Sequence, residues 1–210
     1  RQQNSNRVLA ALAQLFNSRC SKVSGHACLA IVAYCRGGNG KENSGVSVDK
    51  QLVLPFLGDV LTMIGNGPLS LEVAGNVDVF IRAFAAVACL ADVVEEDFSG
   101  FYPSIMPGLI ECTGYGLERD ANGNFTGRGS ASDESVALRG GAIESASIVG
   151  QAVGQCDGLF HPDAEKLMQL ILPLLDAHAS SDAAALIAQD QLLAASARIA
   201  CVMKAAYAPF

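Results

Sequence analysis

The sequence contains no tryptophan, and aromatic residues make up only 6% of its 210 positions. β-Sandwiches and β-barrels usually draw on Thr, Tyr and Trp, so this scarcity argues against an all-β fold. Half of the residues are hydrophobic, and Ala, Leu and Val dominate them. That mixture favours helices that pack through small side chains. The composition therefore predicts an all-α protein.

Basic residues are also scarce. The chain has 14 Lys and Arg against 21 Asp and Glu, for a net charge of −7. Proteins that bind nucleic acid without regard to sequence neutralise phosphates with Lys and Arg, so no direct nucleic-acid binding is expected. An acidic chain suits a partner that is itself basic.

No Cys-x-x-Cys pair occurs. Most of the seven cysteines fall in apolar runs, and Cys28 and Cys35 share one helical face because they are seven residues apart. We expect Cys28, Cys35, Cys89 and Cys201 to be buried and reduced, rather than zinc ligands or members of a disulfide framework. This pattern favours a reducing compartment, cytosol or nucleus.

A membrane span is not expected. The longest apolar run, VDVFIRAFAAVACLADVV (77–94), is interrupted by Asp78, Arg82 and Asp92. The chain begins RQQNSNR, without Met or a signal peptide, and ends AAYAPF. We expect the chain to be a piece of a longer protein built from repeated helix pairs.

Helical spacing of apolar residues recurs along the chain. Four segments share a similar register: 7–16, 51–61, 102–112 and 165–175. Each is followed by a second segment with many small residues: 20–36, 71–96, 134–155 and 183–206. One helix pair cannot bury its apolar face alone, but stacked neighbours bury a continuous core. The pattern predicts an α-solenoid of about four antiparallel helix pairs in one array over 1–210, with approximate units 3–36, 49–96, 101–155 and 163–206.

Three of the first segments contain the same kernel of an apolar residue, Pro, any residue and Leu. Its prolines are Pro55, Pro107 and Pro173. A proline inside a helix removes one backbone hydrogen bond and kinks the axis. Recurrence at matched positions predicts that all three prolines lie within first helices. We also expect a structure without strands.

The most polar stretch, 115–132, interrupts the third unit. Asp120, Asn122 and Asn124 alternate as in a calcium loop. Phe125 and Ala131 stand where an EF-hand requires Gly and Glu, so calcium binding is not expected.

The glycines in and beside this stretch predict a flexible insertion. The glycosylation acceptor Asn124-Phe125-Thr126 matters only in a secreted protein. Phosphorylation is an alternative role for the serines that follow: Ser130, Ser132 and Ser135.

Enzyme motifs are incomplete. RGGNGKENSG (36–45) resembles a phosphate loop, but Cys35 and Glu42 occupy positions that the Walker pattern reserves for Gly and Ser or Thr. Cys20 and His26 are a candidate nucleophile pair, yet no third orienting residue accompanies them. No catalytic role and no cofactor are predicted.

Two further motifs have structural explanations. His161, Asp163 and Glu165 are a candidate metal set, but Pro162 and an acidic first turn are typical of a helix start. Gly150 and Gly154 form GxxxG among polar residues, which indicates close packing of soluble helices rather than a membrane dimer.

The runs FIRAFAAVACLADVVEEDFSGFYPSIMPGL (80–109) and LRGGAIESASIVGQAVG (138–154) resemble nuclear transport receptors of the importin-β superfamily, most closely the beta-three branch. The resemblance covers nearly the whole chain, although family members usually have a much shorter connection at 115–132. It implies a monomeric HEAT-repeat import receptor that shuttles between cytoplasm and nucleus. It also implies as partners cargo proteins with basic localisation signals, Ran-GTP and FG-repeat nucleoporins, with no enzymatic activity.

The resemblance also assigns residues. Asp133 and Arg139 match the Asp and Arg of the HEAT consensus, which form a ladder between repeats. Second helices line the surface that meets partners, and the polar residues on them form a contact stripe: Glu144, Gln151, Gln155, Asp190 and Arg198. A solvated helix face is the alternative for each. For the whole chain the alternatives are a HEAT or armadillo scaffold without a transport role and, third, an all-α enzyme.

Overall fold

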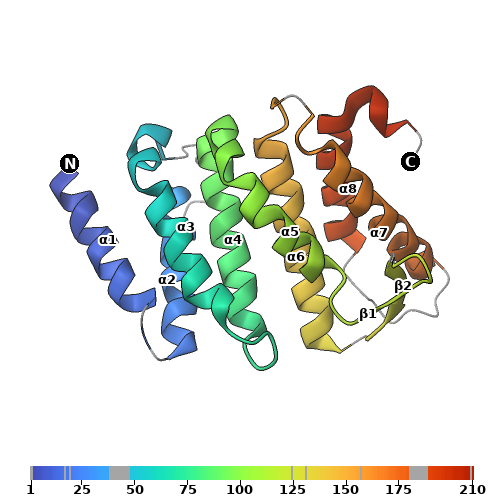
Figure 1. The fold of residues 1–210 in the computed structure, drawn as a ribbon, viewed down its shortest axis with the longest axis horizontal. Coiled ribbons are helices and arrows are strands. Elements are labelled where there is room, and N and C mark those ends of the chain that lie inside the picture. The colour runs from blue at the N-terminus through green and yellow to red at the C-terminus, as the bar shows by residue number, and fades with distance from the viewer. Residues whose placement is uncertain are drawn as a thin grey trace. The chain divides into compact units, whose positions relative to one another are not determined.

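The computed structural model describes residues 2–16, 18, 20–37, 48–123, 125–130, 132–156, 158–179, 189–208 and 210. These residues form eight α-helices, several short 3-10 turns and one β-hairpin. The contacts divide the chain into two compact units, Arg1–Val94 and Glu95–Phe210. The predicted all-α architecture is confirmed, with four antiparallel helix pairs (Figure 1).

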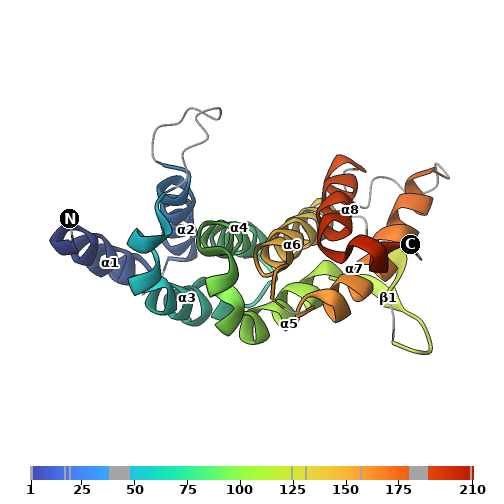
Figure 2. The same cartoon turned by 90° about the horizontal axis from the view of Figure 1, so that it is seen from above.

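The first unit contains two helix pairs. They are α1 (Gln2–Phe16) with α2 (Ser21–Cys35), and α3 (Leu57–Asn66) with α4 (Val77–Val94). α2 packs along α4, and α1 packs against α2 and α3. Seen from above, α2 and α4 form one layer and α1 and α3 the other (Figure 2). The core between the layers is apolar and includes Phe16, Ile31, Ile64, Phe84 and Val87.

Pro55 does not lie inside a helix, so this part of the proline prediction is wrong. It lies in the 3-10 turn η2 (Leu54–Phe56), which follows the turn η1 (Lys50–Leu52) and precedes α3. Because proline has no N–H and a fixed φ, it suits a first turn better than a helix interior. After α3, the turn η3 (Pro68–Ser70) delays the second helix, which begins at Val77 rather than near residue 71.

One segment, Lys50–Ser70 (21 residues), is long and apolar enough to cross a membrane by length and composition, and its most apolar 18-residue window has a mean hydropathy of 1.4. It is not one continuous helix, because 3-10 turns flank α3 on both sides. The 10 residues of α3 span only about 15 Å, against about 30 Å for a bilayer core. Leu57, Val60 and Ile64 of α3 are buried in the unit. We therefore interpret the segment as part of a packed core.

The second unit contains α5 (Tyr102–Thr113) with α6 (Asp133–Ala152), and α7 (His161–Ala179) with α8 (Gln189–Met203). The 3-10 turns η4 (Glu95–Gly100) and η5 (Lys204–Tyr207) lie at its ends. α6 packs against both α5 and α8, and α7 contacts α5 and α8. Pro107 lies inside α5 and Pro173 inside α7, which confirms the prediction for these two kernel prolines.

Residues 117–129 include two strands, so the prediction of a structure without strands is wrong. β1 (Leu117–Arg119) pairs antiparallel with β2 (Phe125–Gly129), in a two-stranded sheet with an irregular register. Asp120 begins the turn, where its carboxylate accepts a hydrogen bond from the backbone N–H of Asn122 at 2.9 Å. Asp120 and Asn122 therefore lie in a hairpin turn. That the insertion moves relative to the helices stays a prediction.

The small residues of α6 allow close packing. The ring of Phe160, just before α7, lies where any side chain at Gly150 would stand. Val202 of α8 lies close against Gly154, which follows the end of α6. The interpretation of the GxxxG motif as a packing feature is confirmed.

Candidate functional site

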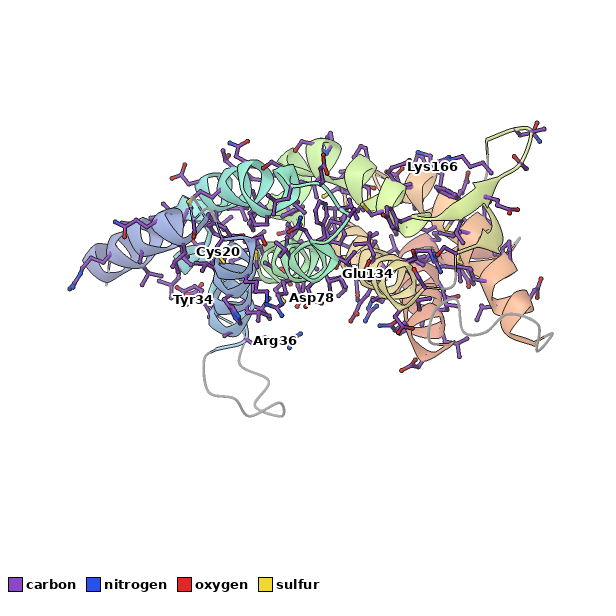
Figure 3. All side chains as sticks on the ribbon, turned by 90° about the horizontal axis from the view of Figure 1, so that it is seen from below. Cys20, Tyr34, Arg36, Asp78, Glu134 and Lys166 are labelled. Atoms are coloured by element: carbon purple, nitrogen blue, oxygen red, sulfur yellow. The ribbon has the colours of Figure 1, made fainter. Side chains whose placement is uncertain are left out.

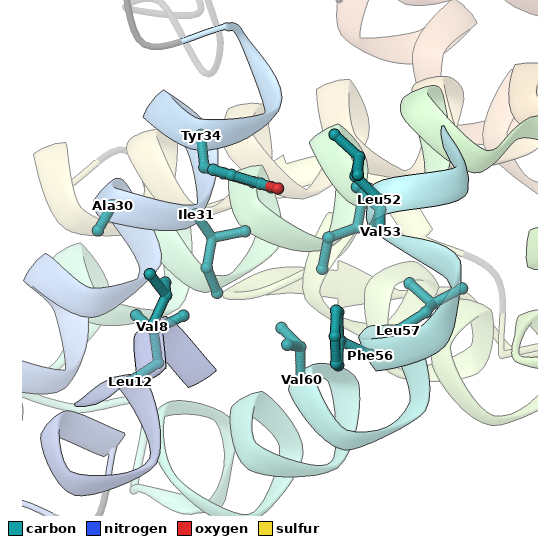
Figure 4. A pocket seen from close by; sticks show the side chains of 11 residues that line it. Val8, Leu12, Ala30, Ile31, Tyr34, Leu52, Val53, Phe56, Leu57 and Val60 are labelled. Carbon is teal, nitrogen blue, oxygen red and sulfur yellow. The ribbon is translucent and has the colours of Figure 1, made fainter. Parts of the chain in front are cut away.

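The first unit holds an apolar groove of about 210 Å³ (Figure 4). Its lining residues come from all four helices of the unit and from the turns before α3: Val8, Leu12, Ala30, Ile31, Tyr34, Leu52, Val53, Phe56, Leu57, Val60 and Leu90. The residues of its floor are buried, among them Ile31, Val53 and Val60. None of the lining residues is charged, so the groove suits an apolar ligand group.

Three large apolar residues of this groove are exposed to solvent: Val8 at 52%, Tyr34 at 45% and Leu52 at 39%. Tyr34 lies near the end of α2, and its phenol extends toward Leu52 (Figure 3 and Figure 4). Covering such side chains removes apolar surface from water, which gives about 25 cal/mol per Å² buried. The groove is therefore a place where an apolar or aromatic side chain of a partner gains affinity.

A second feature is the exposed stripe of α6. Its members follow one another at intervals of four and three residues: Ala137, Gly141, Glu144, Ile148 and Gln151. Each is exposed or partly exposed, whereas most of the neighbouring residues in α6 are buried. Glu144 and Gln151 lie on this stripe and are exposed, as the contact-stripe prediction requires. Their binding role stays a prediction.

The other stripe residues are placed differently. Gln155 is exposed but lies beyond the last residue of α6, Ala152. Asp190 is exposed in the first turn of α8. Arg198 of α8 reaches α6, where its Nη1 donates to the Oγ of Ser147 at 3.1 Å.

The predicted ladder residues lie at the start of α6. Asp133 is exposed in the first turn. It is followed by Glu134, which Figure 3 labels. Arg139 is fully buried, with 0% exposure. Its Nη1 donates to the carbonyl of Tyr115 at 2.8 Å and its Nη2 to the carbonyl of Ser130 at 2.9 Å.

These two acceptors belong to the connection between α5 and α6, within the third helix pair. The ladder prediction requires Arg139 to reach an adjoining helix pair. The two hydrogen bonds instead tie both ends of the hairpin to α6. Burial lowers the pKa of the Arg139 guanidinium, but two carbonyl acceptors compensate for lost hydration. A ladder role between repeats stays a prediction.

Additional contacts hold the hairpin to α5. The Arg119 guanidinium bonds both carboxylate oxygens of Glu111 at 3.0 Å and lies 3.9 Å from the centre of the Phe125 ring. The Phe125 ring occupies the space that a side chain at Gly114 would need. The segment predicted to be a flexible insertion is therefore anchored by packing, a cation–π contact and charge-assisted hydrogen bonds.

The serines beside the hairpin cap α6. The Oγ of Ser132 accepts a hydrogen bond from the backbone N–H of Ser135 at 3.3 Å, which is the N-cap arrangement. Ser130 and Ser132 are exposed and Ser135 is buried. Phosphorylation there stays a prediction.

The cysteine prediction holds only in part. Cys28 and Cys35 are buried, whereas Cys89 is half-buried and Cys201 is exposed. Ile199 and Met203 of α8 are buried, and Cys201, two residues from each, lies on the other face. The prediction of burial is wrong for Cys201.

The other candidate sites from the sequence are a nucleophile pair, a metal site, a glycosylation acceptor and a phosphate loop. Cys20 precedes α2 and is exposed, and His26 lies on the exposed side of α2. Among the residues that the structure describes, no group of three or more His, Cys, Asp or Glu is placed to hold a metal. Asn124 and most of 36–45 lie outside the described residues.

Asp163 has a role that sequence reasoning missed. Its carboxylate accepts a hydrogen bond from the Tyr102 hydroxyl at 2.8 Å and one from Lys166 Nζ at 2.8 Å. The apolar groove was also missed. No local signal identifies either feature, because both combine residues from segments far apart in the chain.

The fold belongs to a class of proteins built from stacked helix pairs, the α-solenoids. No protein-family model matches the sequence. Among solved structures, similar ones are Kap121p bound to Pho4p, Kap121p bound to Nup53p, and the karyopherin Kap121p bound to the SUMO protease Ulp1p. Each has a TM-score of 0.70 and 23% sequence identity, over 97–98% of this chain. The chain spans 16% of the length of those proteins.

Proposed function

We propose that this chain is a HEAT-repeat part of a nuclear transport receptor of the importin-β superfamily, acting by binding and without catalysis. The observation that supports this most is the match of nearly the whole chain to Kap121p, a karyopherin, at a TM-score of 0.70. The net charge of −7 agrees with a receptor for basic cargo. Such a receptor works in both cytoplasm and nucleus and is expected to be a monomer.

Ran-GTP binding separates an import receptor from a HEAT or armadillo scaffold. The intact protein, immobilised, should retain Ran loaded with a GTP analogue and should not retain Ran loaded with GDP. Equal retention of both forms, or of neither, would contradict the proposal and favour a scaffold role.

The apolar groove supports FG-repeat nucleoporins as one class of partner. Phenylalanine side chains are the aromatic groups that such repeats offer, and the groove has an apolar lining and an exposed rim. Leu52→Asp at the rim should weaken binding of an FG-repeat peptide about tenfold, because it places a charge against an apolar ligand.

Leu15→Asp is the matched control. Leu15 lies on α1, is 40% exposed and does not line the groove, against 39% for Leu52. Fluorescence anisotropy with a labelled peptide measures both variants. An equal loss of affinity for the two would indicate a nonspecific effect of charge, and no loss for Leu52→Asp would remove the groove from consideration.

The acidic members of the contact stripe support basic cargo as the second class of partner. Glu144→Arg and Asp190→Arg should each weaken binding of a basic localisation peptide, because they replace attraction with repulsion. Asp176→Arg, an exposed position on α7 outside the stripe, is the charge-matched control. If all three variants weaken binding equally, the net charge and not the stripe attracts the peptide.

A further inference from the structure

The starts of α5 and α7 are joined by one hydrogen bond. The Tyr102 hydroxyl, in the first turn of α5, donates to Oδ2 of Asp163, in the first turn of α7, at 2.8 Å. Tyr102 is only 3% exposed. The two residues are 61 positions apart and belong to successive helix pairs of the second unit. The bond is thus a direct polar link between two repeats.

The chemistry of the pair favours a strong, persistent bond. Burial raises the pKa of the Tyr102 phenol and the hydrogen bond to Asp163 raises it further, so the phenol keeps its proton and remains the donor. The other carboxylate oxygen of Asp163 bonds Lys166 at 2.8 Å. A carboxylate acceptor makes the link charge-assisted, about twice as strong as a neutral bond. The same carboxylate also complements the dipole of α7.

Surrounding packing restricts the start of α7 from a second side. Phe160, which precedes α7 and is 1% exposed, lies against Gly150 of α6. The backbone carbonyl of Phe160 accepts bonds from the N–H groups of Asp163 and Ala164 at 3.1 and 2.8 Å. The first turn of α7 is thereby fixed to α6 through Phe160 and to α5 through Asp163.

We propose that the Tyr102–Asp163 hydrogen bond is a conformational lock that holds the fourth helix pair at a fixed position against the third. It does for these two pairs what the Asp133–Arg139 ladder was expected to do, with different residues. Breaking it frees the start of α7 to open locally while the packing around α6 keeps the unit folded.

The first test is native-state hydrogen exchange in the intact protein. Tyr102→Phe removes one hydroxyl and retains the ring, and amides in the first turns of α7 should then exchange about tenfold faster or more. Amides of α2, in the other unit, should not change. Tyr115→Phe is the matched control, a half-buried tyrosine of the same unit whose backbone carbonyl is unaffected by the substitution. Unchanged exchange in α7 of Tyr102→Phe would overturn the proposal.

The second test is a double-mutant cycle. Tyr102→Phe should lower the thermal midpoint by about 3–10 °C, as expected for loss of a hydrogen bond to a charged group in a chain of this size. In the background of Asp163→Ala, the same substitution should have little further effect. Glu165→Ala removes a nearby exposed carboxylate and controls for the helix dipole. Additive effects of Tyr102→Phe and Asp163→Ala would show that the bond does not couple the two helices.

Discussion

Arg139 donates a hydrogen bond to the backbone carbonyl of Tyr115 at 2.8 Å, from a position in α6 with no exposure to solvent. With the second bond to Ser130, one guanidinium closes both ends of the hairpin. A planar group with several fixed donors suits two carbonyls that approach from the two ends of the hairpin. The insertion and the helix pair therefore form one structural unit.

Arg139→Ala should lower the free energy of unfolding by about 2–4 kcal/mol, since it removes two charge-assisted hydrogen bonds and leaves two carbonyls unsatisfied. Urea denaturation measures this. Arg119→Ala is the control, because Arg119 is 44% exposed and its salt bridge with Glu111 lies at the surface, where such a pair contributes about 1 kcal/mol or less. Similar losses for the two variants would contradict an anchoring role that is particular to Arg139.

Limited proteolysis adds a local measure of the same anchor. In Arg139→Ala the segment 116–130 should be cleaved earlier than in the wild type, because its ends are no longer held. A flexible insertion at 115–132, as the sequence predicts, would be cleaved first in any case. If cleavage in the wild type begins elsewhere and Arg139→Ala does not alter it, both the anchor and the predicted flexibility are wrong.

Gly114→Ala should destabilise the protein by about 1–3 kcal/mol, because the added methyl group overlaps the Phe125 ring. Combining it with Phe125→Ala should recover part of the loss. Gly108→Ala in α5 is the matched control: its Cβ would meet nothing within 4 Å, so it should stabilise the helix by about 0.5–1 kcal/mol. Thermal unfolding of the four variants tests the contact, and additive losses for Gly114→Ala and Phe125→Ala would contradict it.

Stability should fall in alkali because of the buried thiols. Burial raises the pKa of Cys28 from its ordinary value of 9.0 to about 12, and that of Cys35 likewise to about 12. In the unfolded chain both thiols ionise near pH 9. Their contribution to the free energy of unfolding is therefore complete below pH 9 and is lost as the pH rises to 12. The slope approaches about 1.4 kcal/mol per pH unit for each thiol.

Urea denaturation at several pH values measures this slope. Cys28→Ala should reduce it, and Cys20→Ala, at an exposed cysteine, should not. In the folded protein at neutral pH, a thiol reagent should label Cys20 and Cys201 rapidly and Cys28 and Cys35 slowly. Rapid labelling of the buried pair would contradict the burial on which the pH prediction depends.

The sequence predicted the helices well because apolar periodicity is a local property that burial then enforces. α5 begins at Tyr102 and ends at Thr113, against an expected 102–112. Prediction from the sequence failed where the local structure depends on contacts between segments that are distant in the chain. The hairpin has a polar composition typical of a loop, and contacts with Arg139, Gly114 and Glu111 hold it to the helices.

The candidate sites follow the same division. Glu144 and Gln151 could be placed on an exposed helix face from spacing alone. The partners of Arg198 and Asp163 could not, because Ser147 and Tyr102 come from other helices. The apolar groove needs residues from every helix of the first unit, so a pattern within one helix does not reveal it.

Glu95 follows the last residue of α4 with a φ of 53°, in the left-handed region that side chains other than glycine rarely adopt. That conformation costs about 1–2 kcal/mol for a residue with a Cβ. Glu95→Gly should therefore raise the free energy of unfolding by about 0.5–1 kcal/mol, after allowance for the greater freedom of glycine in the unfolded chain. Glu95→Ala keeps the Cβ and with it the strain, so its stability should stay within about 0.5 kcal/mol of the wild type. Both variants remove the same exposed carboxylate. The difference between their free energies of unfolding therefore measures the effect of the backbone conformation alone. If urea denaturation gives glycine and alanine the same stability at this position, the left-handed conformation is not strained in solution.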